Sequence, residues 1–509
     1  MVSPKFWLRM PRLLFVLLPI FPFYLFSRPV RYEVAPLFRG DELRLQVCMW
    51  FAGDADGETH LLLPGQFGPA DKLFRCIRNL GSGSAGCRLK VAADTLSATL
   101  QHAPGQEIKL CYEVVQDFAG ANPGEKDVFR PILQAGYFHV LGQVLFLAPR
   151  WPGGYEVTLT WKNFPAGWVL YNSFGAQATT QHFSATGLRW LESVFVGGDY
   201  RAYRTAVQDR PVWLVVRGRD WGFRDDSLLT MLERTVASQR NFWQDFDLPE
   251  YTVVLTPLAM RPAMSSGAGV SSVSLFNAGA GLTNSFTAFA TPHPGSGTAD
   301  LCHLFHHEMM HDWIGGRIRS GTGPEDMQLA WFSEGFTEYL ALKNMLSGGF
   351  ITAAQYIDLL NGRVLDGLYR TDRREAPNRT IADSFFVDSD IARLPYLRGC
   401  AFAFFMDNAI KAGSSGRRHL HGLMLDLLEY YQRPGRSLND NFDFFLETCS
   451  GHLERDMAPL YEKYIVQGRL IPVEAFTLPP YLKMEAGEAG VPVLHLDRSV
   501  ERWESSLKQ

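Results

Sequence analysis

The sequence lacks the features that a nucleic-acid-binding protein needs. Its 509 residues contain no obvious repeat, no low-complexity tract and no long basic run, and the formal net charge is -4. This charge provides no electrostatic basis for attracting nucleic acid. The composition, 46% hydrophobic and 20% charged, is that of an ordinary globular protein. A chain of this length is too long for one core, so we expect about three domains.

The N-terminus also lacks an apolar run of the length that a membrane-spanning helix requires. Lys5, Arg9 and Arg12 precede a shorter run over residues 13–26, which two prolines interrupt. This is the pattern of a secretory signal, although no small-residue cleavage site follows it. We therefore expect export, with residues 1–29 acting as a signal peptide or as a retained membrane anchor. The alternative is a buried apolar segment of the fold.

Cysteines are few, seven in all. Cys48, Cys76, Cys87 and Cys111 lie in the N-terminal third, where an oxidising compartment would permit pairing. Cys76 and Cys87 together would close a short loop, although sequence alone does not fix the connectivity. The other three are scattered, and we expect them to be buried small hydrophobic residues: Cys302, Cys400 and Cys449.

Residues 30–204 consist of short alternating apolar and polar segments, such as "ELRLQVCMWF" and "YEVTLTWKNFP", separated by Gly, Pro, Asn and Asp. This pattern is typical of an antiparallel β-sandwich. Further strands alternate with a helical stretch over residues 228–246, which indicates a second domain beginning near Pro211. Residues 264–296 are rich in Gly, Ala, Ser and Thr and are expected to form a loop. The chain after residue 353 is mostly helical.

The most informative segment is "LCHLFHHEMMHDWIGGRI", where the apolar spacing becomes helical. His307 and His311 are four residues apart and therefore project from one face of the expected helix. Two neutral imidazoles so placed provide two ligands for Zn²⁺. Glu308 follows the first ligand and is placed to hold a water molecule without binding the metal.

A third ligand is expected on the next helix, within "WFSEGFTEYL". Glu334 lies between apolar neighbours, which is an unusual position for a carboxylate that only meets solvent. Two histidines and one glutamate leave a zinc position open for water, and this is the arrangement of catalytic sites. A binding protein that keeps zinc only for stability is the rival hypothesis.

Other polar residues near the motif have two interpretations each. Glu338 lies one turn after Glu334, where it is either a solvated surface charge or a hydrogen-bond acceptor for a ligand histidine. Asp312 competes for the same supporting role. His303 and His306 are interpreted as packing or supporting residues, because a further helical ligand would close the open position.

"HHEMMHDWIGGRIR" followed by "LAWFSEGFTEYL" resembles the glycyl aminopeptidase-like family of gluzincin zinc metallopeptidases. That family is related to the aminopeptidase N and leukotriene A4 hydrolase family, and the resemblance extends over residues 157–468. It implies a multidomain α+β fold. Together with the patterns above, we expect a signal or anchor segment (1–29), an N-terminal β-sandwich (30–210), a thermolysin-like zinc catalytic domain (211–347), a helical domain (348–475) and a C-terminal tail (476–509).

The segment "LPYLRGCAFAFFMDNAI" is similar to the part of both families that carries a catalytic tyrosine. The resemblance implies that Tyr396 stabilises the oxyanion. A phenol suits this role physically, because it is neutral at pH 7 and donates a hydrogen bond.

In one respect the sequence departs from the family pattern. These families place a glycine-rich edge strand before the zinc helix, often with a glutamate that binds the free amine of the substrate. The expected counterpart is "MSSGAGVSSVSLF", which contains no acidic residue. Either Glu325 or Asp326 supplies the acid, or free amines are not selected.

The sequence thus predicts an exported zinc-dependent peptidase, of the aminopeptidase type, located in the cell envelope, in the periplasm or on a membrane anchor. One Zn²⁺ per chain would be held by His307, His311 and Glu334, with Glu308 and Tyr396 as catalytic residues and a peptide as substrate. An endopeptidase or a non-peptidase zinc hydrolase on the same scaffold are the alternatives. Oligomeric state and substrate sequence are not predicted.

Overall fold

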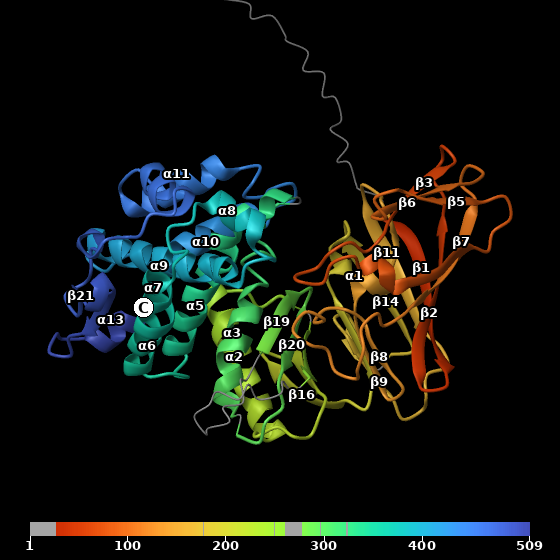
Figure 1. The fold of residues 1–509 in the computed structure, drawn as a ribbon, viewed down its shortest axis with the longest axis horizontal. Helices are drawn as coiled ribbons and strands as arrows, with labels where there is room; N and C mark the ends of the chain where they lie inside the picture. The colour runs from red at the N-terminus through yellow and green to blue at the C-terminus, as the bar shows by residue number, and fades with distance from the viewer. Residues whose placement is uncertain are drawn as a thin grey trace, which may run out of the picture.

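The computed structural model describes residues 27–176, 178–248, 250–259, 277–295, 297–321 and 324–508 (Figure 1). The chain is a multidomain α+β protein, with a sheet-rich N-terminal part and a helical C-terminal part. The apolar run 13–26 and the expected edge strand 264–276 lie outside the described residues. Within the described residues, no helix is long and apolar enough to cross a membrane.

Three sheets form the N-terminal part, at the right of Figure 1. The first contains, in spatial order, β14 (Thr180–Thr186), β11 (Gly154–Trp161), β1 (Arg28–Arg39), β2 (Glu42–Ala52), β7 (Glu107–Val114) and β4 (Ile77–Ser82). The second contains β10 (Ala148–Pro149), β3 (Glu58–Leu62), β6 (Ser97–Gln101) and β5 (Arg88–Val91). The third contains β13 (Gly175–Ala176), β12 (Val169–Asn172), β15 (Val194–Gly198), β9 (Tyr137–Leu141) and β8 (Ile132–Gln134). Three short helices connect these strands: η1 (Leu73–Cys76), α1 (Gly142–Leu145) and η2 (Arg189–Leu191).

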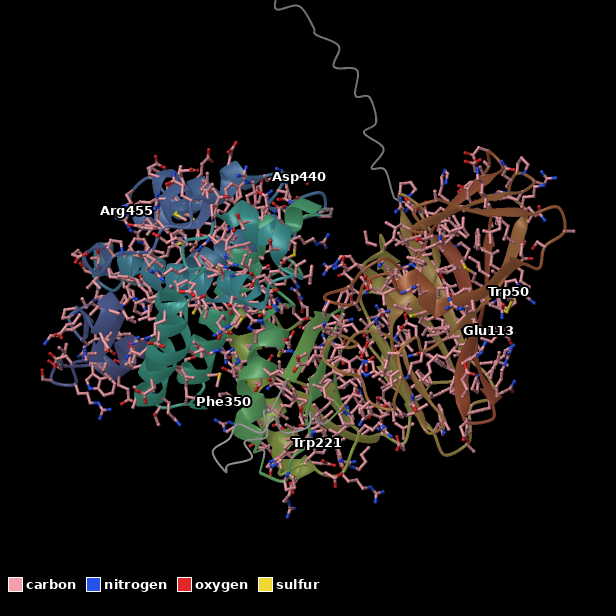
Figure 2. All side chains as sticks on the ribbon, viewed as in Figure 1. Trp50, Glu113, Trp221, Phe350, Asp440 and Arg455 are labelled. Atoms are coloured by element: carbon pink, nitrogen blue, oxygen red, sulfur yellow. A yellow bond between two sulfur atoms is a disulfide. The ribbon has the colours of Figure 1, made fainter. Side chains whose placement is uncertain are left out.

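A disulfide joins the two neighbouring strands β2 and β7, in the sheet that Trp50 and Glu113 mark in Figure 2. It links Cys48 to Cys111, which are directly opposite in register with their Cα atoms 4.1 Å apart. Cys76 and Cys87 are free, so of the pairings that the sequence left open the structure contains Cys48 with Cys111. Strand register decided the outcome, and register depends on pairing between segments far apart in the sequence. The remaining three cysteines are buried and free, as expected.

A five-stranded sheet lies between the N-terminal part and the helices. Its spatial order is β16 (Arg201–Val207), β17 (Arg210–Val216), β18 (Tyr251–Pro257), β20 (Ser285–Ala290) and β19 (Asn277–Leu282). Alternate residues of its strands face opposite sides. Val253 and Leu255 belong to the core shared with α2 (Asp225–Trp243) and α3 (Thr298–Met310), whereas Val254 belongs to the N-terminal core. Burial on both faces explains why β18 is apolar almost throughout.

The expectation of a loop over residues 264–296 is wrong in its second half. Residues 277–290 form the hairpin β19–β20, and among the described strands β19 lies at the edge of the sheet, beside α3. The sequence "NAGAGL" has no apolar alternation, because glycines occupy the positions where a neighbouring element approaches closely.

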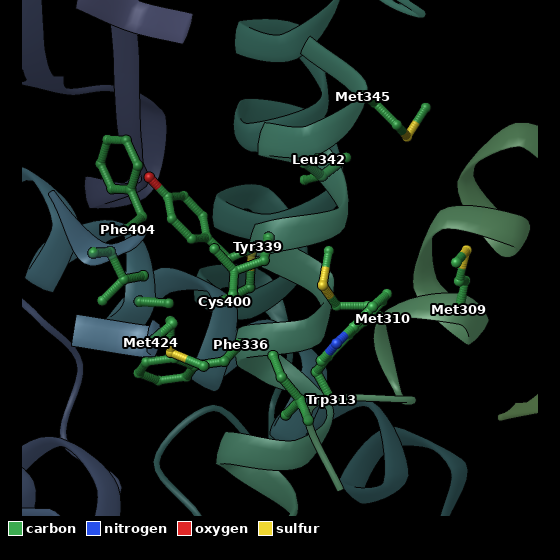
Figure 3. Packing of buried hydrophobic residues seen from close by; sticks show 14 of the residues in the cluster. Met309, Met310, Trp313, Phe336, Tyr339, Leu342, Met345, Cys400, Phe404 and Met424 are labelled. Carbon is green, nitrogen blue, oxygen red and sulfur yellow. The ribbon is translucent and has the colours of Figure 1, made fainter. Parts of the chain in front are cut away.

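The helical part follows α3 and shares one hydrophobic core with it. Its elements are η3 (Pro324–Leu329), α4 (Ala330–Ser333), α5 (Gly335–Ser347), α6 (Ala353–Leu359), the π-helix η4 (Leu360–Leu365), α7 (Asp366–Arg370), α8 (Asn378–Ser384), α9 (Ser389–Gly413), α10 (Leu420–Tyr431), α11 (Phe442–Leu453), α12 (Ala458–Tyr461) and the π-helix η5 (Glu462–Val466). Figure 3 shows side chains of α3, α5, α9 and α10 meeting in this core, with Met310, Phe336, Phe404 and Met424 among them.

The C-terminal residues pack on the same core. They form η6 (Val473–Ala475), a hairpin of β21 (Leu482–Ala486) and β22 (Pro492–Leu496) with η7 (Glu488–Gly490) between its strands, and α13 (Trp503–Lys508). Leu507 is buried, and its carbonyl oxygen accepts a hydrogen bond from Lys343 Nζ at 2.5 Å. The tail is therefore fastened to α5, which also carries part of the candidate site.

Candidate metal centre

Helix α3 presents the first part of the site. His307 and His311 lie one turn apart, and their Nε2 atoms are 3.2 Å from each other. Both side chains are largely buried, with 8% and 17% of their surfaces exposed. The helix buries its other apolar residues in the core, so its fixed packing aims the two imidazoles at a common point.

Glu334 completes the donor set from the junction between α4 and α5. Its Oε2 atom lies 3.3 Å from His307 Nε2 and 3.5 Å from His311 Nε2. The ligand atoms of all three residues lie within 4.8 Å of one another. Two imidazoles and one carboxylate are a donor set that suits Zn²⁺, and the assignment of these three residues as ligands stays a prediction.

The electrostatics of the cluster favour a bound cation. Burial lowers the pKa of His307, but hydrogen bonds to Glu334 and Glu338 outweigh burial and raise that pKa to about 10. Burial raises the pKa of Glu334, but His311 and His307 outweigh burial and hold that pKa well below its usual range. The carboxylates therefore favour positive charge at the site, and protons would compete with a divalent ion for the same nitrogen atoms.

Helix α9 crosses the α4–α5 junction at two glycines. A methyl group at position 399 would lie 1.9 Å from the carbonyl oxygen of Trp331, and one at position 335 would lie 2.3 Å from the Cα atom of Gly399. Only glycine permits this approach. The crossing brings Tyr396, which precedes Gly399 by one turn of α9, next to the donor set.

Tyr396 stacks on a predicted ligand. Its ring lies 5.8 Å from the ring of His307 at an angle of 26°. Burial and the neighbouring Glu334 and Glu308 carboxylates raise the pKa of Tyr396 well above its usual range. The phenol therefore keeps its proton and remains a hydrogen-bond donor.

The side chain of Glu308, which belongs to α3, lies against strand β19. A methyl group at position 279 would lie 2.4 Å from Glu308 Cγ, and one at position 281 would lie 2.5 Å from His311 Cβ. The two glycines let the strand approach the face of the helix that carries Glu308 and His311. Burial raises the pKa of Glu308, against the opposing effect of His307 and His311. A carboxylate with a raised pKa is suited to exchanging protons near neutral pH.

Of the two residues considered as possible supports for a ligand histidine, the structure places Glu338 in contact with His307. Glu338 is 2% exposed, and His307 Nδ1 lies 3.2 Å from its Oε2 atom. Asp312 lies elsewhere, beside Tyr251, and burial raises its pKa to about 8. His311 Nδ1 instead donates to the carbonyl oxygen of Ile314 at 3.1 Å.

The two other histidines of the motif occupy different places. His303 lies against Glu338, with 3.1 Å between its Nε2 atom and Glu338 Oε2. His306 is fully buried under Phe350, its Nδ1 donates to the carbonyl oxygen of Cys302 at 2.8 Å, and burial lowers its pKa to about 3. His306 is thus a neutral packing residue.

The described residues 277–295, which include β19, contain no carboxylate. The side chains of Glu325 and Asp326 lie outside what the structure describes. Thr283, just after β19, donates its backbone N–H to the carbonyl oxygen of Glu192 at 2.7 Å. The side chain of Glu192 is 52% exposed and lies 3.6 Å from Arg189, so an acidic residue contacts the end of the strand through its backbone.

The comparison with protein families matches residues 300–387 to the M61 glycyl aminopeptidase family. The predicted resemblance is confirmed. The matched segment contains His307, Glu308, His311 and Glu334 and ends before Tyr396. No curated protein matches the sequence.

Solved structures of similar fold include the following two. An aminopeptidase N family protein from Idiomarina loihiensis is 16% identical with a TM-score of 0.70, covering 91% of this chain and 81% of that one. Yeast LTA4 hydrolase, solved with bestatin, is 12% identical with a TM-score of 0.51, covering 88% and 68%. At these identities the likeness concerns the fold alone, and it is the family match that supports a peptidase.

Sequence reasoning missed two contributors to the site. The glycines of β19 were available as a signal, because alternate glycines in a strand indicate close backbone approach. Arg363 gave no signal. It lies in η4, and its Nε atom is 3.0 Å from Glu338 Oε1.

Proposed function

We propose that the protein is a zinc-dependent peptidase of the aminopeptidase type, with a peptide as substrate and one Zn²⁺ per chain. The observation that carries this proposal is the convergence of three donor side chains, a buried glutamate and a neutral phenol from α3, the α4–α5 junction and α9. A site that only stabilised the fold would need neither Glu308 nor Tyr396.

Each residue of the site has a separate proposed role. His307, His311 and Glu334 would hold the ion, which when bound would polarise the scissile carbonyl and activate water. Glu308 takes the proton of the attacking water and delivers it to the leaving amine. The Tyr396 hydroxyl donates to the oxyanion of the substrate, a contact typically worth ~3 kcal/mol of barrier.

A peptide-library digest tests the proposal. Purified protein should cleave peptides after zinc loading, lose activity with a chelator and regain it when zinc is returned. Cleavage that a chelator leaves unchanged would exclude the metal mechanism. A protein that takes up zinc but hydrolyses only esters or other non-peptide substrates would support the non-peptidase alternative.

An endopeptidase is the second candidate, because residues 277–295 contain no carboxylate to receive a free amine. Burying an unpaired ammonium costs several kcal/mol. Comparing the cleavage rates of a dipeptide amide and of its N-acetylated form distinguishes the two candidates. An aminopeptidase prefers the free amine, and Glu192→Ala, Glu325→Ala or Asp326→Ala should abolish that preference. Equal cleavage of both peptides identifies an endopeptidase.

We further propose the finer division of the chain. The sheet-rich part would be a β-sandwich over residues 30–210, followed by a thermolysin-like domain (211–347), a helical domain (348–475) and the tail (476–509). Limited proteolysis followed by mass spectrometry of stable fragments tests these boundaries. Cleavage sites concentrated inside a proposed domain would argue against its boundaries.

A further inference from the structure

The buried carboxylate of Glu338 is held from three sides. Its Oε2 atom lies 3.2 Å from His307 Nδ1 and 3.1 Å from His303 Nε2, both on α3. Its Oε1 atom lies 3.0 Å from Arg363 Nε. The neighbouring residue on α9 is Cys400, whose thiol stays protonated because burial raises its pKa. Within the described residues, Arg363 is therefore the permanent positive charge in contact with this carboxylate.

Arg363 reaches Glu338 from the surface. Its side chain is 49% exposed, whereas that of Glu338 is 3% exposed. The Nε–H is not aligned with Oε1 as in a hydrogen bond, so the contact is an ion pair. The guanidinium covers the buried carboxylate on the side that faces solvent.

A π-helical turn places Arg363 there. The turn η4 joins α6 to α7, and π-helical turns occur frequently at functional sites. Asn361 fixes the turn to β22, because its side chain donates to the Leu494 carbonyl at 2.9 Å and accepts from the Leu494 N–H at 2.7 Å. The extra residue in such a turn changes the direction in which the following side chains project, so the turn decides where the guanidinium lies.

The position of Glu338 matters for His307. An imidazole that donates from Nδ1 to a fixed carboxylate presents Nε2 as its ligand atom and cannot turn its ring. His307 Nε2 is the atom that faces Glu334 and His311. A Glu338 side chain free to rotate would no longer fix that orientation.

We infer that Arg363 is a positioning residue for the metal centre, holding Glu338 against His307 with His303 as a second contact. The inference rests on the metal site of the proposed function but not on peptide cleavage. It assigns a role in metal retention to a residue outside both metal-binding helices and outside the H-E-x-x-H motif.

A purely electrostatic effect of Arg363 would have the opposite sign. A positive charge near the site repels Zn²⁺, so its removal would strengthen metal binding. Loss of positioning weakens metal binding. The direction of the change in the zinc release rate therefore decides between the two.

The experiment measures release of zinc from the loaded full-length protein into an excess of a chromogenic chelator, without substrate. Arg363→Gln should release zinc on the order of tenfold faster than the unmodified protein, the low end for loss of a supporting contact. Arg363→Lys should recover part of the difference, because the charge remains. Arg370→Gln is the matched control: Arg370 lies on α7, is 48% exposed and pairs with the exposed Asp366. This control should leave release unchanged.

Two further measurements test whether Arg363 acts through Glu338 and not through overall stability. Thermal unfolding of zinc-free Arg363→Gln and Arg370→Gln is recorded, and release is compared at a temperature where both variants are fully folded, which excludes a general loss of stability. Adding Arg363→Gln to Glu338→Gln should change release little, because the two residues act through one contact. Unchanged or slower release from Arg363→Gln overturns the inference. Absence of zinc uptake by the unmodified protein overturns both this inference and the proposed function, whereas zinc retention without peptide cleavage overturns only the latter.

Discussion

Glu308 and Glu334 are both carboxylates of the candidate site, but one is predicted to transfer protons and the other to bind zinc. Substituting each by glutamine distinguishes the two roles. Glu308→Gln should keep the fold and the zinc, because Glu308 is not among the clustered donors. Peptide turnover should fall by at least about 100-fold, since an amide cannot accept the proton of the water. Turnover measured beside metal content checks this, and near-normal turnover with full zinc content would exclude Glu308 as the base.

Glu334→Gln should instead weaken zinc binding, because it removes the single anionic member of the donor set. Metal analysis after dialysis against a weak chelator gives the zinc content per chain. Full occupancy in this variant would exclude Glu334 as a ligand. The pair of variants thus distinguishes loss of metal from loss of proton transfer.

At the scale of elements, the site depends on how closely α9 approaches the α4–α5 junction. Gly399→Ala should destabilise the protein by about 1–3 kcal/mol or more, because a methyl group would lie 1.9 Å from the Trp331 carbonyl oxygen. It should also lower kcat, since Tyr396 moves with α9. Thermal unfolding and steady-state kinetics measure both effects.

The control for this substitution is Gly413→Ala, at the C-terminal end of the same helix. A methyl group there meets no atom within 4 Å. We expect unchanged kinetics and equal or slightly higher stability, because alanine favours a helix over glycine. Similar losses in both variants would show that the crossing at Gly399 has no special importance.

At the scale of the whole molecule, the two hydrophobic cores should respond separately. The disulfide Cys48–Cys111 crosslinks strands β2 and β7 of the N-terminal part, and its two cysteines are 63 residues apart in the sequence. Replacing both cysteines by alanine should cost about 2–4 kcal/mol of N-terminal stability. The zinc release rate should not change, because the donor set belongs to the other core. A change in zinc release would reveal coupling between the cores.

The cellular location of the protein is also a prediction at the scale of the whole molecule. The basic residues and apolar run at the N-terminus predict that the protein fractionates with the cell envelope or the membrane. N-terminal sequencing of the isolated protein separates a cleaved signal from a retained anchor. Recovery of the intact chain from the cytosol alone would exclude both.

The sequence by itself determined those features that depend on neighbours along one element. Helical spacing put His307 and His311 on one face, and both lie there in α3. The same spacing placed Glu338 one turn after Glu334, although it left open whether Glu338 or Asp312 supports a histidine. The sheet-rich N-terminal part and the helical C-terminal part also followed from local patterns, because side-chain periodicity reports which face of each element is buried.

Tertiary structure alone decided which segments meet. The pairing of Cys48 with Cys111 depends on the register of β2 and β7, and the approach of Tyr396 depends on the crossing at Gly399. The contact of Arg363 with Glu338 depends on a π-helical turn that β22 fastens. The disulfide pairing and the Arg363 contact have no local signature, and the place of Tyr396 was implied only by the family resemblance. Each contact is stabilised by packing between segments distant in the chain, and the free energy of such packing is a property of the assembled core.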